Sequence, residues 1–295
     1  MNDRLSSKDC SLDQLAAYSP WPARLLGLVP WEPKTKTPAE ITREFEDEKW
    51  GPLWRRVQSE GRQINVSTLY SWFEDSAHVE LCSRGSEFVP LTSAQANEAW
   101  LELVAENIAP WLPAPALVEL GCGFGNVLLS LAKRFGSDTG RTMGGEYTKS
   151  GGELLNYLAH QESLNVQAGT CDFNLPGITS LSVPPDAVIY TSYAAHYVRY
   201  LTGRFVEDLC AFRPRIVIHF EPCYEHTCTD SLIGLMRRRY IEVNDYNRNL
   251  VTVLEAAQNE SRIEIVSQSP NLFGSNPLLP ASLIAWKPIR KAAKH

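Results

Sequence analysis

An acid and three alternating glycines follow an apolar run in residues 117–126, Leu-Val-Glu-Leu-Gly-Cys-Gly-Phe-Gly-Asn. Because glycine lacks a Cβ atom, this spacing predicts a tight turn from a strand into a helix that a ligand can approach closely. A dinucleotide site would need Gly-x-Gly-x-x-Gly, with the helix N-terminus directed at a pyrophosphate. Here Asn126 takes the place of the third glycine, and the Glu119 carboxylate would repel a phosphate. The candidate ligand-binding residues are Glu119, Gly121, Gly123 and Gly125.

The carboxylate of Glu119 suits a ligand with a cationic end, such as the amino group and sulfonium of S-adenosylmethionine. The segment resembles the first motif of class I S-adenosylmethionine-dependent methyltransferases, in which an acid lies two residues before Gly-x-Gly-x-Gly. This resemblance covers roughly residues 112–290 and implies that the acid and the glycines bind this cofactor. A plain tight turn is the alternative, because a short glycine motif also arises by chance.

Two more acids follow predicted strands in the same half of the chain. Glu146 ends the second predicted strand, where a carboxylate can accept both ribose hydroxyls of a nucleoside. Asp172 follows a predicted strand at 166–170 and would accept from the adenine amino group. The order Glu119, Glu146, Asp172 resembles the order in which methyltransferases contact methionine, ribose and adenine. Each acid alone would pass for a solvated loop residue.

A second group of candidates lies near the ends of two later predicted strands, at 186–190 and 215–222. Chemistry in open α/β sheets is concentrated at the carboxyl ends of the strands. We therefore predict His196 and Glu221 as the catalytic residues. One hypothesis makes His196, Glu221 and His226 a two-histidine, one-carboxylate site for a divalent metal, zinc or iron. His219 complicates it, because alternation places His219 on the same strand face as Glu221.

Two other interpretations of these residues stay open. In one, His196 is a general base that needs no metal. In the other, His219 is a hydrogen-bonded strand residue, Glu221 is a cofactor-site or loop acid, and His226 lies on the surface.

The catalytic hypotheses imply different substrates. A histidine base suffices for methylation of oxygen or nitrogen. Methylation of carbon beside a ketone needs an acidified C–H bond, which a metal chelated by the carboxylate and keto oxygens of a 2-oxo acid provides. The His-x-Glu-Pro segment at 219–222, the compact length and the predicted cap resemble bacterial 2-oxo acid C-methyltransferases, which make β-methylated amino-acid precursors for peptide natural products. That resemblance implies metal-assisted C-methylation at the β-carbon through an enolate.

Two alternatives to this function stay open. One is a metal-independent O- or N-methyltransferase of a small metabolite that uses His196 as its base. The other is a non-catalytic protein that binds S-adenosylmethionine.

The pattern of the chain predicts an α/β, Rossmann-like methyltransferase sheet of seven strands in residues 112–290, closed by an antiparallel pair at 263–267 and 282–286. Residues 1–111 hold seven of the eight tryptophans and are predicted to form a mostly helical cap or lid. Residues 291–295 form a basic tail.

Two capping boxes predict helices in the cap. Thr37-Pro38-Ala39-Glu40 begins a helix that is expected to end near Trp50, before Gly51-Pro52. Thr92-Ser93-Ala94-Gln95 begins a helix that is expected to end near Trp111 and to lead into the first strand.

Composition limits the partners. The net charge is −6 and the basic residues are scattered, so the chain lacks the basic surface of a nucleic-acid-binding protein and a small-molecule substrate is expected. No stretch is long and apolar enough to span a bilayer, and the N-terminus lacks an apolar signal core. Seven cysteines without framework spacing fit reduced thiols. These features predict a cytoplasmic enzyme with no membrane partner, and a homodimer is a candidate assembly.

Overall fold

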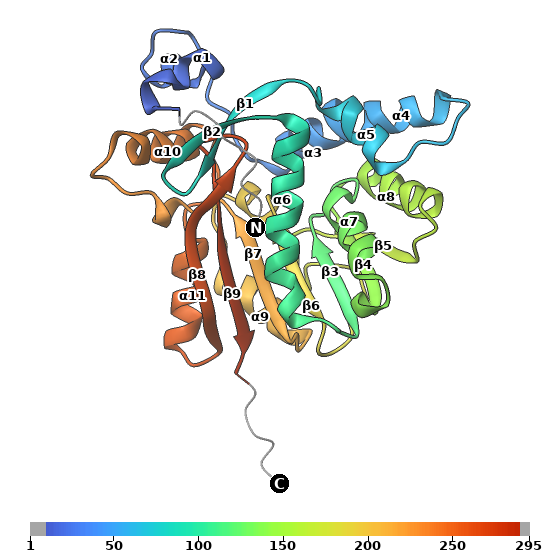
Figure 1. Ribbon diagram of the computed structural model, residues 1–295. Coiled ribbons are helices and arrows are strands. Elements are labelled where there is room, and N and C mark those ends of the chain that lie inside the picture. The colour runs from blue at the N-terminus through green and yellow to red at the C-terminus, as the bar shows by residue number, and fades with distance from the viewer. Residues whose placement is uncertain (1–9, 290–295) are drawn as a thin grey trace.

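A mixed sheet of nine strands forms the centre of the computed structural model, which describes residues 10–289 (Figure 1). The strands are β1 (Val79–Arg84), β2 (Glu87–Thr92), β3 (Ala116–Leu120), β4 (Arg141–Glu146), β5 (Val166–Thr170), β6 (Val188–Ser192), β7 (Ile216–Glu221), β8 (Ile263–Gly274) and β9 (Ala281–Pro288). Their order is β2-β1-β8-β9-β7-β6-β3-β4-β5. Strands β3 to β7 are parallel, and β8 and β9 form the predicted antiparallel pair.

The α/β Rossmann-like fold is confirmed, but the predicted count of seven strands is wrong for the described residues. The two extra strands, β1 and β2, come from the segment predicted to be helical and extend the sheet beyond β8. Gly85 and Ser86 join them, and Gly85 has a φ of +60°, as a two-residue hairpin loop requires. Pro90 argues against a strand in the sequence, but β2 lies at the edge of the sheet, where proline is tolerated.

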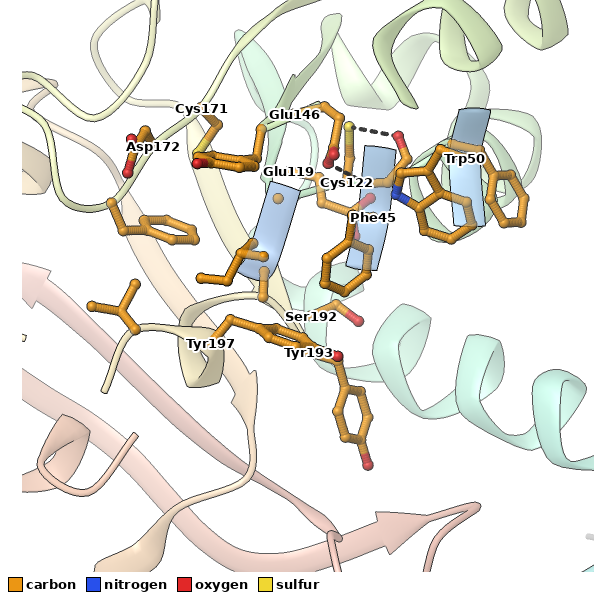
Figure 2. A pocket seen from close by; sticks show the side chains of 18 of the residues that line it. Phe45, Trp50, Glu119, Cys122, Glu146, Cys171, Asp172, Ser192, Tyr193 and Tyr197 are labelled. Atoms are coloured by element: carbon orange, nitrogen blue, oxygen red, sulfur yellow. Dashed lines mark hydrogen bonds between the residues drawn. The ribbon is translucent and has the colours of Figure 1, made fainter. Parts of the chain in front are cut away.

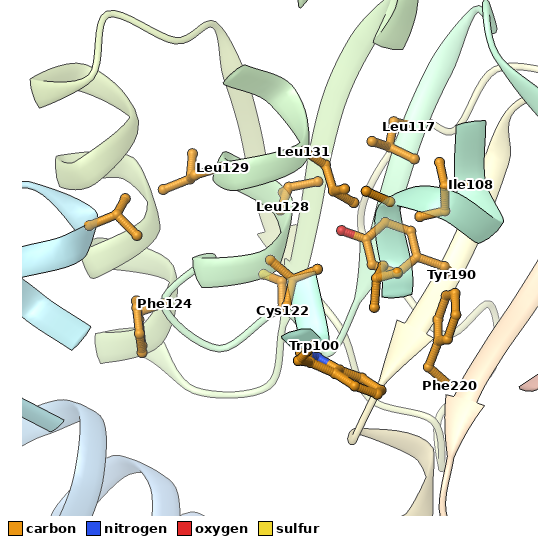
Figure 3. Packing of buried hydrophobic residues seen from close by; sticks show 14 of the residues in the cluster. Trp100, Ile108, Leu117, Cys122, Phe124, Leu128, Leu129, Leu131, Tyr190 and Phe220 are labelled. Atoms are coloured by element: carbon orange, nitrogen blue, oxygen red, sulfur yellow. The ribbon is translucent and has the colours of Figure 1, made fainter. Parts of the chain in front are cut away.

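Helices cover both faces of the sheet. On one face lie α6 (Ser93–Ile108), α7 (Asn126–Phe135) and α8 (Lys149–Gln161), and on the other lie α9 (Gly203–Ala211) and α11 (Leu250–Asn259). Alternate residues of each parallel strand therefore enter two different cores: Leu117 packs with the first helix group and Val118 with the second. Figure 3 shows Leu117 and Tyr190 of the sheet among Trp100 and Ile108 of α6.

The remaining helices belong mostly to the N-terminal segment, which lies along the upper edge of the sheet in Figure 1. They are α1 (Leu15–Tyr18), α2 (Trp21–Leu25), α3 (Pro38–Thr42), α4 (Gly51–Ser59), α5 (Val66–Phe73) and, later in the chain, α10 (Leu232–Val243). Short turns of 3-10 helix are η1 (Leu12–Gln14), η3 (Ala109–Trp111), η4 (Gly136–Thr139), η5 (Ala195–Tyr197) and η6 (Tyr224–His226). The predicted cap is thus partly helical and partly the β1–β2 hairpin.

A π-helix, η2 (Arg43–Trp50), joins α3 to α4. The predicted start at Thr37 is confirmed, because its side chain accepts from the Glu40 N–H. The predicted end near Trp50 is wrong, since the helix continues to Ser59. Gly51 makes this continuation possible: its N–H bonds the Glu46 carbonyl, and a Cβ there would lie 2.3 Å from that oxygen.

The helix predicted from Thr92 has both halves of its capping box and ends at Ile108, followed by η3 through Trp111. No helix within residues 10–289 is long and apolar enough to cross a membrane. The predicted basic tail at 291–295 lies outside the described residues, and the predicted boundary at residue 111 stays a prediction.

Candidate active site

The glycine loop between β3 and α7 has the tight backbone that its sequence predicts. Gly121, Gly123 and Gly125 have φ values of 79°, 54° and 88°, a region that L side chains rarely adopt. A Cβ on Gly121 would lie 2.3 Å from the Cβ of Ala194, and one on Gly123 would lie 3.2 Å from the Trp50 ring. The glycines are therefore required both by the turn and by the elements that approach it.

Glu146, at the end of β4, is tied directly to this loop. Its Oε2 accepts the Gly123 N–H at 2.8 Å, and its Oε1 accepts from the Thr148 N–H at 3.0 Å and the Thr148 hydroxyl at 2.7 Å. Burial raises the pKa of Glu146, although these donors oppose the shift. Oε2 accepts one bond here, so it keeps a lone pair for a ligand hydroxyl.

Glu119, at the end of β3, is buried with far fewer donors. Its Oε2 accepts the Tyr190 hydroxyl at 3.0 Å, and its side chain is 2% exposed. Burial raises the pKa of Glu119 to about 8, and the nearby Glu146 and Glu221 carboxylates add to the shift. Among the described residues, no cationic side chain is paired with this carboxyl group.

A cavity of about 210 Å³, the glycine-loop cavity, opens beside these residues. The predicted acids Glu119, Glu146 and Asp172 all line it, so the structure brings the three together with the glycines (Figure 2). Asp172 accepts from the backbone and side-chain amides of Asn174 at 2.9 and 3.1 Å. Their individual roles toward a ligand stay predictions.

The N-terminal segment closes this cavity with aromatic rings. The ring centroids of Phe45 and Tyr197 lie 4.8 Å apart in an edge-on contact, and those of Trp50 and Phe124 lie 5.3 Å apart, also edge-on. Figure 2 shows both Phe45 and Trp50 among the side chains that line the cavity. These rings were not predicted as site residues, because helical spacing cannot show which face of a helix covers a cavity on a distant strand.

Glu46, in the same π-helix, holds this segment on the sheet. Its carboxylate accepts from the Ser150 N–H at 3.0 Å and the Ser150 hydroxyl at 2.5 Å. Ser150 lies in the first turn of α8, where free N–H groups favour an anion.

His196 and Glu221 form a buried pair at the carboxyl ends of β6 and β7. Three backbone N–H groups, from Ala194, Ala195 and His196, donate to the Glu221 carboxylate at 2.9 to 3.2 Å, and Nδ1 of His196 lies 3.2 Å from Oε2. Burial favours the neutral acid, but the His196 ring and the N–H groups outweigh it and hold the pKa of Glu221 below its usual value. Burial also lowers the pKa of His196, although the hydrogen bond and the charge of Glu221 act to raise it.

Within residues 10–289 the contact of Nδ1 with Glu221 is the hydrogen bond that the His196 ring makes, and it leaves Nε2 available to a ligand. The ring lines a second cavity, of about 360 Å³, which we name the histidine cavity. Phe45, Tyr193 and Tyr197 line both this cavity and the glycine-loop cavity, so the two adjoin. A buried base therefore faces the space next to the predicted cofactor site.

His219 is a core residue and does not face this space. Its Nδ1 lies 3.0 Å from the Thr191 hydroxyl oxygen, and its Nε2 accepts a hydrogen bond from the Trp286 indole N–H at 3.0 Å. Complete burial lowers the pKa of His219 to about 4. The interpretation of His219 as a hydrogen-bonded strand residue agrees with this geometry.

The predicted metal set of His196, Glu221 and His226 is not assembled. Within residues 10–289, no group of three or more His, Cys, Asp or Glu side chains is arranged to hold a metal ion. The turn η6 places Nε2 of His226 2.5 Å from the side-chain amide of Gln268. The Glu221 oxygens already accept hydrogen bonds from backbone N–H groups. The described residues therefore give this prediction no support, because strand spacing does not show where the following loop turns.

Tyr193 was also missed, although it lines both cavities. It has a φ of 51°, and its hydroxyl donates to the Leu279 carbonyl at 3.0 Å. A usable signal existed: Tyr193 follows β6 directly, at the same sheet edge as the predicted His196.

No family model and no curated protein sequence matches this chain. Among solved structures, the chain is similar to magnesium protoporphyrin IX methyltransferase from Synechocystis PCC 6803 with bound SAH, with a TM-score of 0.50 and 12% identity over 84% of this chain and 99% of that one. A geranyl diphosphate C-methyltransferase from Streptomyces coelicolor A3(2) gives a TM-score of 0.47 and 14% identity over 81% of this chain and 98% of that one. The first likeness, together with the strand order, shows that the chain has the fold of class I S-adenosylmethionine-dependent methyltransferases.

Proposed function

We propose that this protein transfers a methyl group from S-adenosylmethionine to an oxygen or nitrogen of a small molecule, with His196 as the general base. The observation that carries the proposal is the buried His196–Glu221 pair, whose imidazole ring lines a cavity adjoining the glycine-loop cavity. A base oriented by a hydrogen-bonded carboxylate is the arrangement that activates a protic nucleophile.

The residues of the glycine-loop cavity fit the cofactor. Cβ atoms at Gly121 and Gly123 would crowd the loop, and the three lining acids favour a ligand with cationic groups and ribose hydroxyls over a phosphate. Glu119 would face the cationic methionine end, Glu146 the ribose and Asp172 the adenine. S-adenosylmethionine supplies an electrophilic methyl group and leaves as a neutral thioether.

The chain's own groups would then manage the proton. Nε2 of His196 accepts the proton from the substrate O–H or N–H as that atom attacks the methyl carbon. Glu221 accepts the Nδ1–H bond and stabilises the imidazolium, because it is already ionised and held by three N–H groups. Phe45 and Trp50 cover the cofactor side and exclude water.

Metal-assisted C-methylation of a 2-oxo acid, the more specific prediction from the sequence, has less support. It needs a Lewis acid beside the substrate, and the three side chains predicted to hold one are not grouped among the described residues. The non-catalytic alternative leaves the His196–Glu221 pair without a role. Retained activity in a chelator would separate the base mechanism from the metal route.

The test compares His196→Ala with His160→Ala, a surface histidine on α8. Transfer of labelled methyl from S-adenosylmethionine is measured on a panel of phenols, alcohols and amines, and cofactor affinity is measured by titration calorimetry. We expect His196→Ala to lose about 10²–10⁴-fold in turnover with unchanged cofactor affinity, and His160→Ala to keep both. A wild-type chain that does not bind the cofactor would overturn the proposal, as would a His196→Ala variant with full turnover.

A further inference from the structure

We propose that the substrate carries a cationic nitrogen group, an ammonium or a guanidinium, that binds at Glu74 and Glu80 in a third cavity. This cavity, of about 310 Å³, is named the glutamate cavity. The inference rests on the proposed function, because it assigns a substrate class to the same site.

The charge of the glutamate cavity is the first argument. Among the described residues that line it, Glu74 and Glu80 are the acids, and no Lys, Arg or His is present. The Glu80 carboxylate accepts the Ser93 hydroxyl at 2.6 Å. The Glu74 side chain makes no hydrogen bond or ion pair with a residue in 10–289, although Lys49 and His78 act on it at longer range.

The charge of Glu80 destabilises the ionised form of Glu74. Burial raises the pKa of Glu74, and the charge of Glu80 raises it further, while Lys49 and His78 oppose the shift. Lys49 is itself bound to Glu44 at 2.9 Å, so it is not free to neutralise the pair. A cation placed between the two acids would remove this repulsion, whereas an anion would add to it.

The aromatic lining of the cavity also suits a cation. Tyr70, Phe73, Trp100 and Tyr193 contribute rings to its wall. Aromatic faces attract ammonium and guanidinium groups, and they also provide an apolar surface for the carbon body of the substrate. The acids and the rings together select an organic cation over a hydrated metal ion.

The position of the cavity connects this anchor to the reaction. Glu74 lines both the glutamate cavity and the histidine cavity, and Tyr193 lines these two and the glycine-loop cavity. His196 is 2% exposed, and its ring lines the histidine cavity that Glu74 also lines. The cation is thus an anchor, and the nucleophile is a second group of the substrate that lies near His196.

Four probes with the same phenol test this arrangement: tyramine, its guanidinium analogue 4-(2-guanidinoethyl)phenol, the neutral tyrosol and the anionic 3-(4-hydroxyphenyl)propionate. Binding to the full chain saturated with S-adenosylhomocysteine is measured by titration calorimetry. We expect at least one of the two cations to bind about tenfold or more tightly than tyrosol, and the propionate to bind most weakly. The two cationic arms show whether the site prefers ammonium or guanidinium.

Glu74→Gln and Glu80→Gln should each reduce the preference for the cation severalfold and leave the affinity for S-adenosylhomocysteine unchanged. Glu98→Gln, an exposed acid on α6, is the matched control and should change neither. Thermal unfolding confirms that each variant is folded. Equal binding of the four probes, or none, would overturn this inference alone if S-adenosylhomocysteine still binds. Loss of that binding in the wild type would instead overturn the proposed function.

Discussion

Two buried carboxylates at one edge of the sheet, on strands that flank β6, differ in how they are solvated by the protein. Glu221 receives three backbone N–H groups and the His196 ring, and its pKa lies below the usual value. Glu119 receives the Tyr190 hydroxyl and weaker help from the Leu128 backbone, and its pKa is raised to about 8. Burial is nearly complete for both, so the hydrogen-bond donors and the neighbouring charges decide the difference.

The difference in pKa indicates different roles for the two carboxylates. Glu221 is ionised before any substrate arrives, which suits a group that stabilises an imidazolium during a proton transfer. Glu119 becomes ionised at neutral pH only when a cation comes close, which suits a group that recognises a cationic ligand.

The largest effect is expected from Glu221→Gln. The amide has an N–H₂ group that cannot accept from the backbone N–H groups, and it cannot neutralise a protonated His196. We expect turnover to fall about 10²–10⁴-fold with little change in cofactor affinity. Steady-state kinetics and calorimetry check this, with Glu255→Gln on the exposed face of α11 as the control. Normal turnover in Glu221→Gln would mean that Glu221 is only structural.

Glu119→Gln should change how cofactor binding depends on pH. At pH 7 the free wild-type carboxyl is mostly protonated, because its pKa is about 8. A bound cation favours the carboxylate, so binding should release a proton and affinity should rise as the pH rises toward 8, by up to about tenfold per unit. Calorimetry in buffers of different ionisation enthalpy counts the released proton. The glutamine variant should retain only the titration of the ligand itself, and an unchanged proton count would contradict this account.

The same substitution should change stability in the absence of ligand. A carboxyl whose pKa is raised on folding stabilises the protein below its unfolded pKa and loses that contribution as the pH rises through the folded value, here about 8. Glu119→Gln cannot ionise, so its melting temperature should exceed that of the wild type by a few degrees at pH 9. At pH 5 the two should differ much less. Parallel melting curves at both pH values would show that Glu119 is not protonated in the folded chain.

The parallel half of the sheet was predictable because its signals are local. An apolar run, an acid and a glycine turn define β3, its loop and α7, and the same rhythm places Glu146 and Asp172 at the sheet edge. Strand order then brings their side chains to one cavity without further information. The hydrogen bonds that separate Glu221 from Glu119 were not predictable, because they depend on the backbone path through Ala194 and Ala195.

The N-terminal segment was less predictable for a different reason. Its helix start at Thr37 is local, but the π-helix and the continuation past Gly51 depend on what the segment packs against. Phe45 and Trp50 have the appearance of ordinary core residues in the sequence, and only the tertiary contacts place them over the glycine loop. The grouping of the predicted metal ligands was unpredictable for the same reason, because the direction of η6 decides where His226 lies.

The smallest effect is expected from Glu46→Gln, because the Glu46 side chain lies outside the proposed proton transfer and the proposed ligand contacts. It attaches the π-helix to Ser150 at the N-terminus of α8, where loss of an anionic cap costs about 1 kcal/mol. Because Phe45 and Trp50 belong to the same π-helix, weakening this contact should let the segment open more often over the cofactor. We expect S-adenosylhomocysteine to dissociate a few-fold faster in stopped-flow measurements, with the rate of methyl transfer unchanged in a single-turnover assay.

Asp47→Asn, on the exposed side of the π-helix, is the control and should leave the dissociation rate unchanged. Equal dissociation rates in the two variants would assign Glu46 to stability alone, and the gating of the cofactor would then rest on the aromatic contacts of Phe45 and Trp50.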